Sequence, residues 1–141
     1  MTATEKLQKA MAYAMANRPA VGGFPFLAEC LRLAGVVQNN WTLPAAQSVY
    51  IMDDGSAIVN QGTPLVSGLV EVPTFDEAAL IAALRTDQAG QGTFPEFLSA
   101  TWQAGVTTYT VDFLARTVIY KGMNGQYAES YNAVEVPELG F

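Results

Sequence analysis

Residues 24–36 read FPFLAECLRLAGV, and residues 94–106 read FPEFLSATWQAGV. The two stretches start with the same Phe-Pro pair and end with the same Ala-Gly-Val triplet. In each, proline falls in the first turn of a predicted helix, where its missing N–H does no harm, and glycine falls where that helix ends. Because the shared residues are those that start and stop secondary structure, we predict that the chain consists of two related halves.

The residues on either side of these stretches repeat the same pattern. Capping boxes at Thr2-x-x-Glu5 and Thr74-x-x-Glu77 predict an earlier helix in each half. After the second helix, apolar residues predict three strands, and Asp54-Gly55 and Asn124-Gly125 predict two-residue turns between the last two strands. The predicted strands are 36–43, 48–52 and 57–60 in the first half, 107–113, 117–121 and 126–131 in the second, and an extra strand at 66–72.

These elements predict a single domain over residues 1–141 of the α+β class. Its two layers would contain internally duplicated α-α-β-β-β halves, approximately 1–73 and 74–141, with the helices packed on one face of a mostly antiparallel sheet. A half of about 70 residues buries little core alone, so we expect the two halves to share one core.

The composition excludes several classes of chemistry. Of 141 residues, 50% are hydrophobic, 14% are charged and none is histidine, which removes Ser-His-Asp and Cys-His catalysis and imidazole metal ligands. Cys30 is the single cysteine, so an internal disulfide is impossible and a reducing cytoplasm is the expected compartment. We predict no catalytic residues, no metal and no cofactor.

The charge pattern bears on possible partners. The formal net charge is −6, and all of it falls in residues 61–141, because residues 1–60 hold four basic and four acidic side chains. No basic run suits a nucleic acid, and no apolar stretch reaches the roughly 20 residues of a membrane span. We therefore expect no nucleic-acid or membrane partner. The acidic half is interpreted as a solvated face or, alternatively, as a docking face for a basic partner.

Two groups of residues are candidates for ligand binding. The first group lies on two predicted strands joined by a short turn, where Arg116 would bind an anion in a polar pocket; alternatively, Asp112 and Arg116 form a simple surface pair. The second group lies in the Gln-Gly-Thr-Pro stretch that starts at residue 61, which is either a ligand-contacting loop or a plain connector. The candidates are Tyr109, Asp112, Arg116 and Tyr120 in the first group, and Gln61 and Thr63 in the second.

Other features have simpler structural interpretations. Asp53 and Asp54 are adjacent carboxylates, but a turn role is favoured over a metal or acid–base pair because neighbouring strand residues point to opposite faces. Cys30 lies on an apolar helix face and is expected to be an inert buried thiol. The aromatic residues Trp41, Phe94 and Trp102 are expected in the core rather than in a platform that stacks nucleic-acid bases.

Several motifs resemble a known family. The stretch NRPAVGGFP at residues 17–25 with LAG at 33–35, QGTPLVSG at 61–68, and FPEF at 94–97 with QAG at 103–105 are similar to the YbcV-like family of small enterobacterial and prophage proteins. That family is a domain of unknown function, and some of its members are labelled phage envelope protein. The resemblance implies a phage-related context and supplies no reaction, cofactor or catalytic residue.

The leading hypothesis is a small cytoplasmic, non-enzymatic protein that binds a protein partner or another copy of itself. It rests on the absence of a nucleophile–base constellation, the duplicated architecture and a surface poor in charge. The alternative is a small-molecule-binding protein or an enzyme that uses carboxylate and tyrosine groups in a cleft between the halves. A deep pocket on which Asp112, Arg116 or a second buried carboxylate converges would favour the alternative. A closed core with a flat apolar patch would favour the binding protein.

Overall fold

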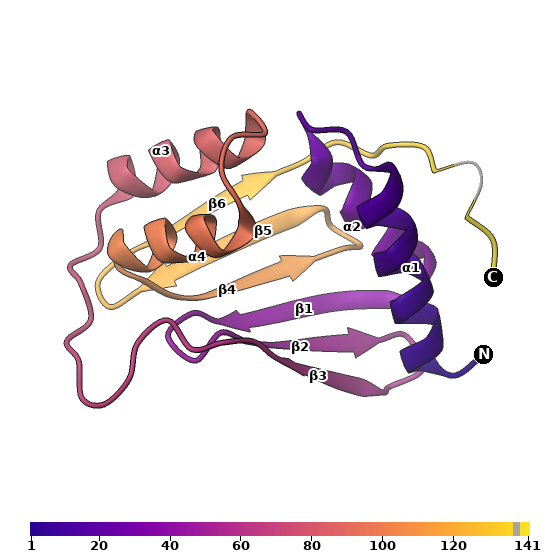
Figure 1. The fold of residues 1–141 in the computed structure, drawn as a ribbon, viewed down its shortest axis with the longest axis horizontal. Helices are drawn as coiled ribbons and strands as arrows, with labels where there is room; N and C mark the ends of the chain where they lie inside the picture. The colour runs from indigo at the N-terminus through magenta and orange to yellow at the C-terminus, as the bar shows by residue number, and fades with distance from the viewer. Residues whose placement is uncertain (137–138) are drawn as a thin grey trace.

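Both halves of the chain contain two helices followed by three strands (Figure 1). The computed structural model describes residues 1–136 and 139–141. Within these residues the first half comprises α1 (Ala3–Asn17), α2 (Gly23–Leu33), β1 (Val36–Thr42), β2 (Gln47–Met52) and β3 (Ala57–Gln61). The second half comprises α3 (Glu77–Gln88), α4 (Phe94–Gln103), β4 (Val106–Asp112), β5 (Thr117–Gly122) and β6 (Gln126–Ser130). The predicted α+β class and the duplicated order of elements are confirmed.

Local capping explains where most of the helices begin. Thr2 and Thr93 each close a complete capping box, with Glu5 and Glu96 respectively. The predicted box at Thr74 is wrong, because Asp76 caps α3 instead and accepts a hydrogen bond from the N–H of Ala79 at 3.0 Å. Within the described part of the chain no helix combines the length and the apolar character that crossing a bilayer requires.

All strands pair antiparallel in one sheet with the order β3-β2-β1-β4-β5-β6. The two halves meet at the centre of the sheet, where Asn40 of β1 lies opposite Thr110 of β4. The hairpins occur where they were predicted, but their turns differ in detail. Gly55 has a φ of +88° and follows a turn at residues 53–54, while the N–H of Gly122 donates to the carbonyl of Gly125 across a loop of two other residues.

The core lies between the helices and one face of the sheet. The inward residues of the strands, such as Tyr50, Tyr109 and Val111, pack with the helices in one hydrophobic cluster. The ring of Phe97 in α4 meets the ring of Tyr109 edge-on at 6.5 Å, which places this helix on the same face. In Figure 1, α3 and α4 lie over β4, β5 and β6, and α1 and α2 lie across the end of the sheet where β1 begins.

Residues 62–76 connect the halves without forming the predicted strand at 66–72. After β3 the chain turns away from the sheet edge, because the N–H of Gly62 donates to the Ala46 carbonyl and that of Leu65 to the Pro44 carbonyl. Leu69 is fully exposed. The apolar residues of this segment alternate as they do in a strand, but the segment pairs with no strand of the sheet.

The end of the chain packs back onto the first two helices (Figure 1). Val136 and Leu139 join the core. The Lys9 ammonium donates to the Gly140 carbonyl at 2.6 Å and lies 5.1 Å from the centre of the Phe141 ring. This segment therefore forms one wall of the surface beside α2.

Candidate functional site

The predicted site residues do not come together in one pocket. Tyr109 and Tyr120 lie opposite each other on β4 and β5, with ring centroids 5.3 Å apart, and both are buried beneath the helices. Burial raises the pKa of both phenols, well above the usual range for Tyr109. A phenol that resists ionisation is a poor base at neutral pH. The two rings therefore belong to the core, away from Arg116.

The expected pairing of Asp112 with Arg116 is wrong. The Asp112 carboxylate accepts hydrogen bonds from the N–H groups of Leu114 and Ala115, at 3.0 and 2.9 Å, and so holds the turn between β4 and β5. Arg116 points from that turn to Glu29 of α2 instead. Aspartate satisfies turn N–H groups readily, and this left the arginine available for another carboxylate.

Gln61 is the last residue of β3, the edge strand of the first half, and Thr63 follows it, whereas the other four candidates belong to the second half. The Gln61 amide donates to the carbonyls of Ala45 and Gly62, at 2.7 and 2.9 Å, and accepts from Gln47 at 3.1 Å. These bonds tie the end of β3 to the turn before β2. Thr63 is exposed and lines neither of the two cavities described below.

The residues with simple interpretations occupy structural positions. Asp54 accepts a hydrogen bond from the Ser56 N–H at 2.8 Å, as a turn residue does, and this bond lowers the pKa of its carboxyl. Cys30 is fully buried, and burial raises the pKa of its thiol. Trp102 is in the core, as expected, and Trp41 is half-buried with its ring against that of Tyr109. The expectation for Phe94 is wrong, because this ring is 44% exposed and packs over Trp41 from outside the core.

A buried carboxylate held by two arginines links the two halves. The Glu29 side chain is 4% exposed, and its oxygens accept hydrogen bonds from Arg116 Nε at 2.6 Å and Arg32 Nε at 2.8 Å. Burial acts to raise the pKa of the Glu29 carboxyl, but the bonds from Arg116 and Arg32 outweigh it and the pKa lies below its usual value. Glu29 therefore stays ionised at neutral pH.

These three residues line a cavity of about 590 Å³ between α2 and the C-terminal segment. The walls are Leu33 and residues 133–136, which are mostly apolar apart from Glu135. Sequence reasoning identified Arg116 but not Glu29 or Arg32. The available signal was an acidic residue on the apolar face of a predicted helix, with an arginine three positions later.

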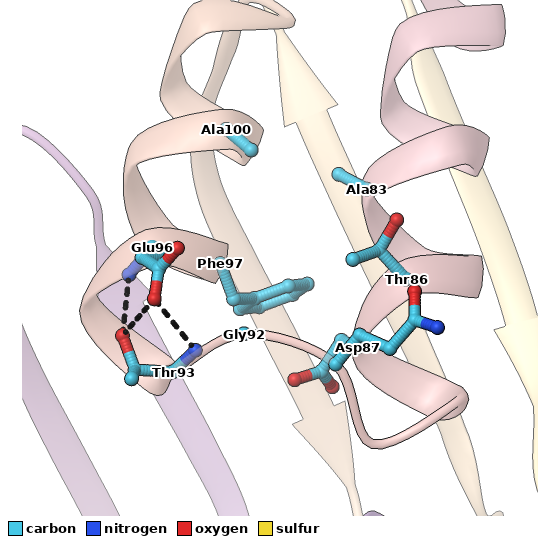
Figure 2. A pocket seen from close by; sticks show the side chains of 9 residues that line it. Ala83, Thr86, Asp87, Gly92, Thr93, Glu96, Phe97 and Ala100 are labelled. Atoms are coloured by element: carbon cyan, nitrogen blue, oxygen red, sulfur yellow. Dashed lines mark hydrogen bonds between the residues drawn. The ribbon is translucent and has the colours of Figure 1, made fainter.

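A smaller cavity of about 190 Å³ lies between α3 and α4 (Figure 2). Asp87 and Phe97 point into it from the two helices, and the capping box of Thr93 and Glu96 forms one rim. Burial raises the pKa of the Asp87 carboxyl, only partly countered by the charge of Arg18. Among the described residues this carboxylate forms no ion pair and accepts no side-chain hydrogen bond.

Within residues 1–136 and 139–141 no helix packs on the other face of the sheet, which we call the open face. Its side chains belong to the strand positions that alternate with the core positions. Across its middle, the register places Val59, Val49, Asn40, Thr110, Ile119 and Ala128 in one row. One further row lies on each side of the middle row. The row on one side contains Ala57, Ile51, Gln38, Asp112, Thr117 and Ser130, and the row on the other side contains Gln61, Gln47, Thr42, Thr108, Lys121 and Gln126.

Comparison with known proteins identifies mycobacterial relatives. The chain is 55% identical over 130 residues to the uncharacterized proteins Rv2012 and MT2067 of two Mycobacterium tuberculosis strains and Mb2035 of Mycobacterium bovis. The similarity covers 92% of this chain and 79% of each relative. No family model matches the chain. The expected membership of the enterobacterial and prophage YbcV-like family is therefore wrong, and the phage context that it implied loses its support.

Proposed function

This chain belongs to the family of the mycobacterial protein Rv2012, and we propose that it is a non-enzymatic binding protein whose open face docks a second copy of the chain. The single observation that carries the proposal is the uncovered face of the sheet. The helices pack on one face of the sheet, and no helix among the described residues packs on the opposite face. The open face therefore presents a broad surface for a partner.

The chemistry of the open face suits contact with protein. Its outer strands contribute Val59, which is 60% exposed, and Ile119 lies half-buried on β5. Only Asp112 and Lys121 are charged among the open-face positions described, and Asp112 is occupied with its own turn. Depletion of charge at the centre of a surface is typical of interfaces.

The pattern of the middle row favours a second copy over another protein. The row has apolar residues at both ends, and Asn40 and Thr110 at its centre, where the Thr110 hydroxyl donates to the Asn40 amide oxygen at 2.9 Å. When two such faces meet about a two-fold axis, apolar ends meet apolar ends and polar centres meet each other. A two-fold interface requires this kind of self-complementary surface.

The size of the open face indicates how strongly two copies should associate. Six strands spaced about 4.8 Å apart, each five to seven residues long at about 3.4 Å per residue, span roughly 24 by 20 Å. The resulting area, about 500 Å², is below the ~800 Å² per partner of a standard interface. We therefore expect a weak, reversible dimer rather than a permanent one. Because each copy carries a net charge of −6, added salt should strengthen association.

Analytical ultracentrifugation across a concentration series tests the proposal. The double variant Val59→Lys, Ile119→Lys places cations on the open face and should weaken dimerisation at least tenfold. The control Met15→Lys changes an exposed apolar residue on α1 and should leave the dimer unaffected. A wild-type chain that stays monomeric at millimolar concentration, or a double variant that dimerises equally well, would overturn the proposal.

The non-enzymatic part of the proposal draws on the state of the candidate acid–base groups. Burial raises the pKa of Tyr109, Tyr120 and Cys30, so none of these three is disposed to ionise near neutral pH. The compartment stays a prediction: a buried, unpaired thiol suits a reducing cytoplasm.

A further inference from the structure

The positive charge around Glu29 exceeds what this carboxylate requires. Arg116 and Arg32 together carry two positive charges against one buried negative charge. Glu29 engages Nε of both side chains and, more weakly, Nη2 of Arg116 at 3.5 Å. Among the described residues, no acceptor takes the remaining guanidinium N–H groups of either arginine. The two side chains are 36% and 31% exposed, so these donors are accessible to a ligand.

The duplication provides an internal control for the role of these charges. The turn before β5 places Arg116 at a φ of +55°, and the equivalent turn before β2 places Ala46 at a φ of +50°. The left-handed turn therefore does not require arginine. In α4, the positions equivalent to Glu29 and Arg32 hold Ser99 and Trp102. The equivalent contact between α4 and the turn before β2 thus forms without these charges, which indicates that they serve something other than the shared architecture.

We propose that the cavity beside α2 binds a small organic carboxylate with an apolar tail, its carboxylate on Arg32 and Arg116 and its tail against Leu33, Val134 and Val136. A guanidinium presents its N–H groups in a planar fork that matches a carboxylate. The cavity of about 590 Å³ is within the range of small-molecule sites. This site lies apart from the open face and goes beyond the proposed self-association.

The two acidic residues of the cavity disfavour a ligand with more than one negative charge. The two arginines and Glu29 carry one net positive charge, but with Glu135 the four charged residues that line the cavity sum to zero. Binding of an anion therefore depends on the free guanidinium N–H groups rather than on a surplus of positive charge. Glu135 is exposed and also lines the cavity, so it repels a second negative charge. A dianionic phosphate therefore fits less well than a carboxylate, and removal of the Glu135 charge should strengthen binding.

The test is a titration of the full chain with sodium hexanoate, followed by amide and arginine Nε–H signals in NMR spectra and by calorimetry. Hexan-1-ol tests the tail alone, and inorganic phosphate tests the anion alone. Wild type should bind hexanoate with shifts at residues of α2 and at Arg116, and should bind the other two probes at least tenfold more weakly. Equal binding of hexan-1-ol, or tighter binding of phosphate, would overturn the assigned ligand class.

Single substitutions test the contribution of each charged residue to hexanoate binding. Arg32→Gln leaves the pair of Glu29 and Arg116 intact and should weaken hexanoate binding about tenfold, equivalent to about 1.4 kcal/mol. Glu135→Gln should strengthen binding severalfold, and Lys121→Gln, on the open face, should change nothing. Because Arg32 is on the surface, its variant is expected to fold, which the amide spectrum verifies. No hexanoate binding at 10 mM, or unchanged binding in a folded Arg32→Gln chain, would refute the site.

Discussion

Replacing Gly105 with alanine tests how tightly the second half closes around the segment before α3. Gly105 has a φ of +88°, and a Cβ built on it would lie 2.6 Å from the Cα and N atoms of Phe75. Gly55 is a matched control, because its φ is also +88° and no atom lies within 4 Å of its Cβ position. The two substitutions therefore share the backbone strain and differ in the crowding.

The expected magnitudes follow from these two terms. Alanine at a left-handed position costs about 1–2 kcal/mol, partly offset by about 0.4–1 kcal/mol through the lower entropy of the unfolded chain. Gly55→Ala should thus lower the free energy of unfolding by about 1 kcal/mol. At Gly105 the methyl group meets backbone rather than a flexible side chain, and overpacking adds about 1–3 kcal/mol. Gly105→Ala should therefore cost about 2–4 kcal/mol.

Urea denaturation of both variants and wild type, monitored by tryptophan fluorescence and circular dichroism, measures the difference. The Gly105→Ala midpoint should fall well below that of Gly55→Ala, with similar slopes. If the two variants lose the same stability within about 0.5 kcal/mol, then crowding against Phe75 contributes nothing and the reasoning is refuted. Gly105→Ala that is more stable than Gly55→Ala would contradict it outright.

Three further substitutions probe the charged groups and a cap. Glu29→Gln should lower the free energy of unfolding by about 2 kcal/mol at pH 7, because it removes charge-assisted bonds to two arginines. Since the pKa of Glu29 is lowered in the folded state, this contribution to stability is present above the pKa of the unfolded chain and is lost as the pH falls through the folded-state pKa. An equal difference in unfolding free energy between wild type and Glu29→Gln at pH 7 and at pH 3, measured by urea denaturation, would contradict this reasoning. Asp87→Asn should stabilise the chain at pH 7, by up to about 1 kcal/mol, because burial raises the pKa of this carboxyl and its ionisation opposes folding as pH rises through that value. The gain should vanish at pH 3 in thermal scans, and a lower Tm at pH 7 would count against it. Thr93→Ala removes the capping box of α4 and should cost about 1 kcal/mol, with faster amide exchange confined to the first turn of that helix. Unchanged exchange there would argue against the cap.

Local signals explain why the elements could be predicted from the sequence. The capping residues Thr2 and Thr93 and the terminating glycines Gly35 and Gly105 act within a few positions of themselves, and each is found in its expected role. The segment 66–72 shows the limit of such signals. Its alternation is typical of a strand, but strand formation needs a neighbouring edge, and the hydrogen bond from Gly62 to Ala46 leads the chain away from one.

The candidate site was harder to predict because its contacts are distant in sequence. Asp112 and Arg116 are close along the chain and of opposite charge, yet Asp112 satisfies its own turn. The carboxylate that Arg116 does bind, Glu29, lies 87 residues away and on another layer. Only the packing of α2 against the turn after β4 brings them together. The order of the strands, with β1 beside β4, is likewise a property of the assembled halves.

The central pairing of β1 with β4 also bears on how the halves could exchange between molecules. If the connector at 62–76 extends, the first half exposes β1 and the second half exposes β4. The exposed β1 of one chain can then pair with the exposed β4 of another chain. Two chains that traded halves would recover every strand pairing and the bond from Arg116 to Glu29, now between chains. Such a swapped dimer would leave both open faces free, so it differs in kind from a dimer in which two open faces meet.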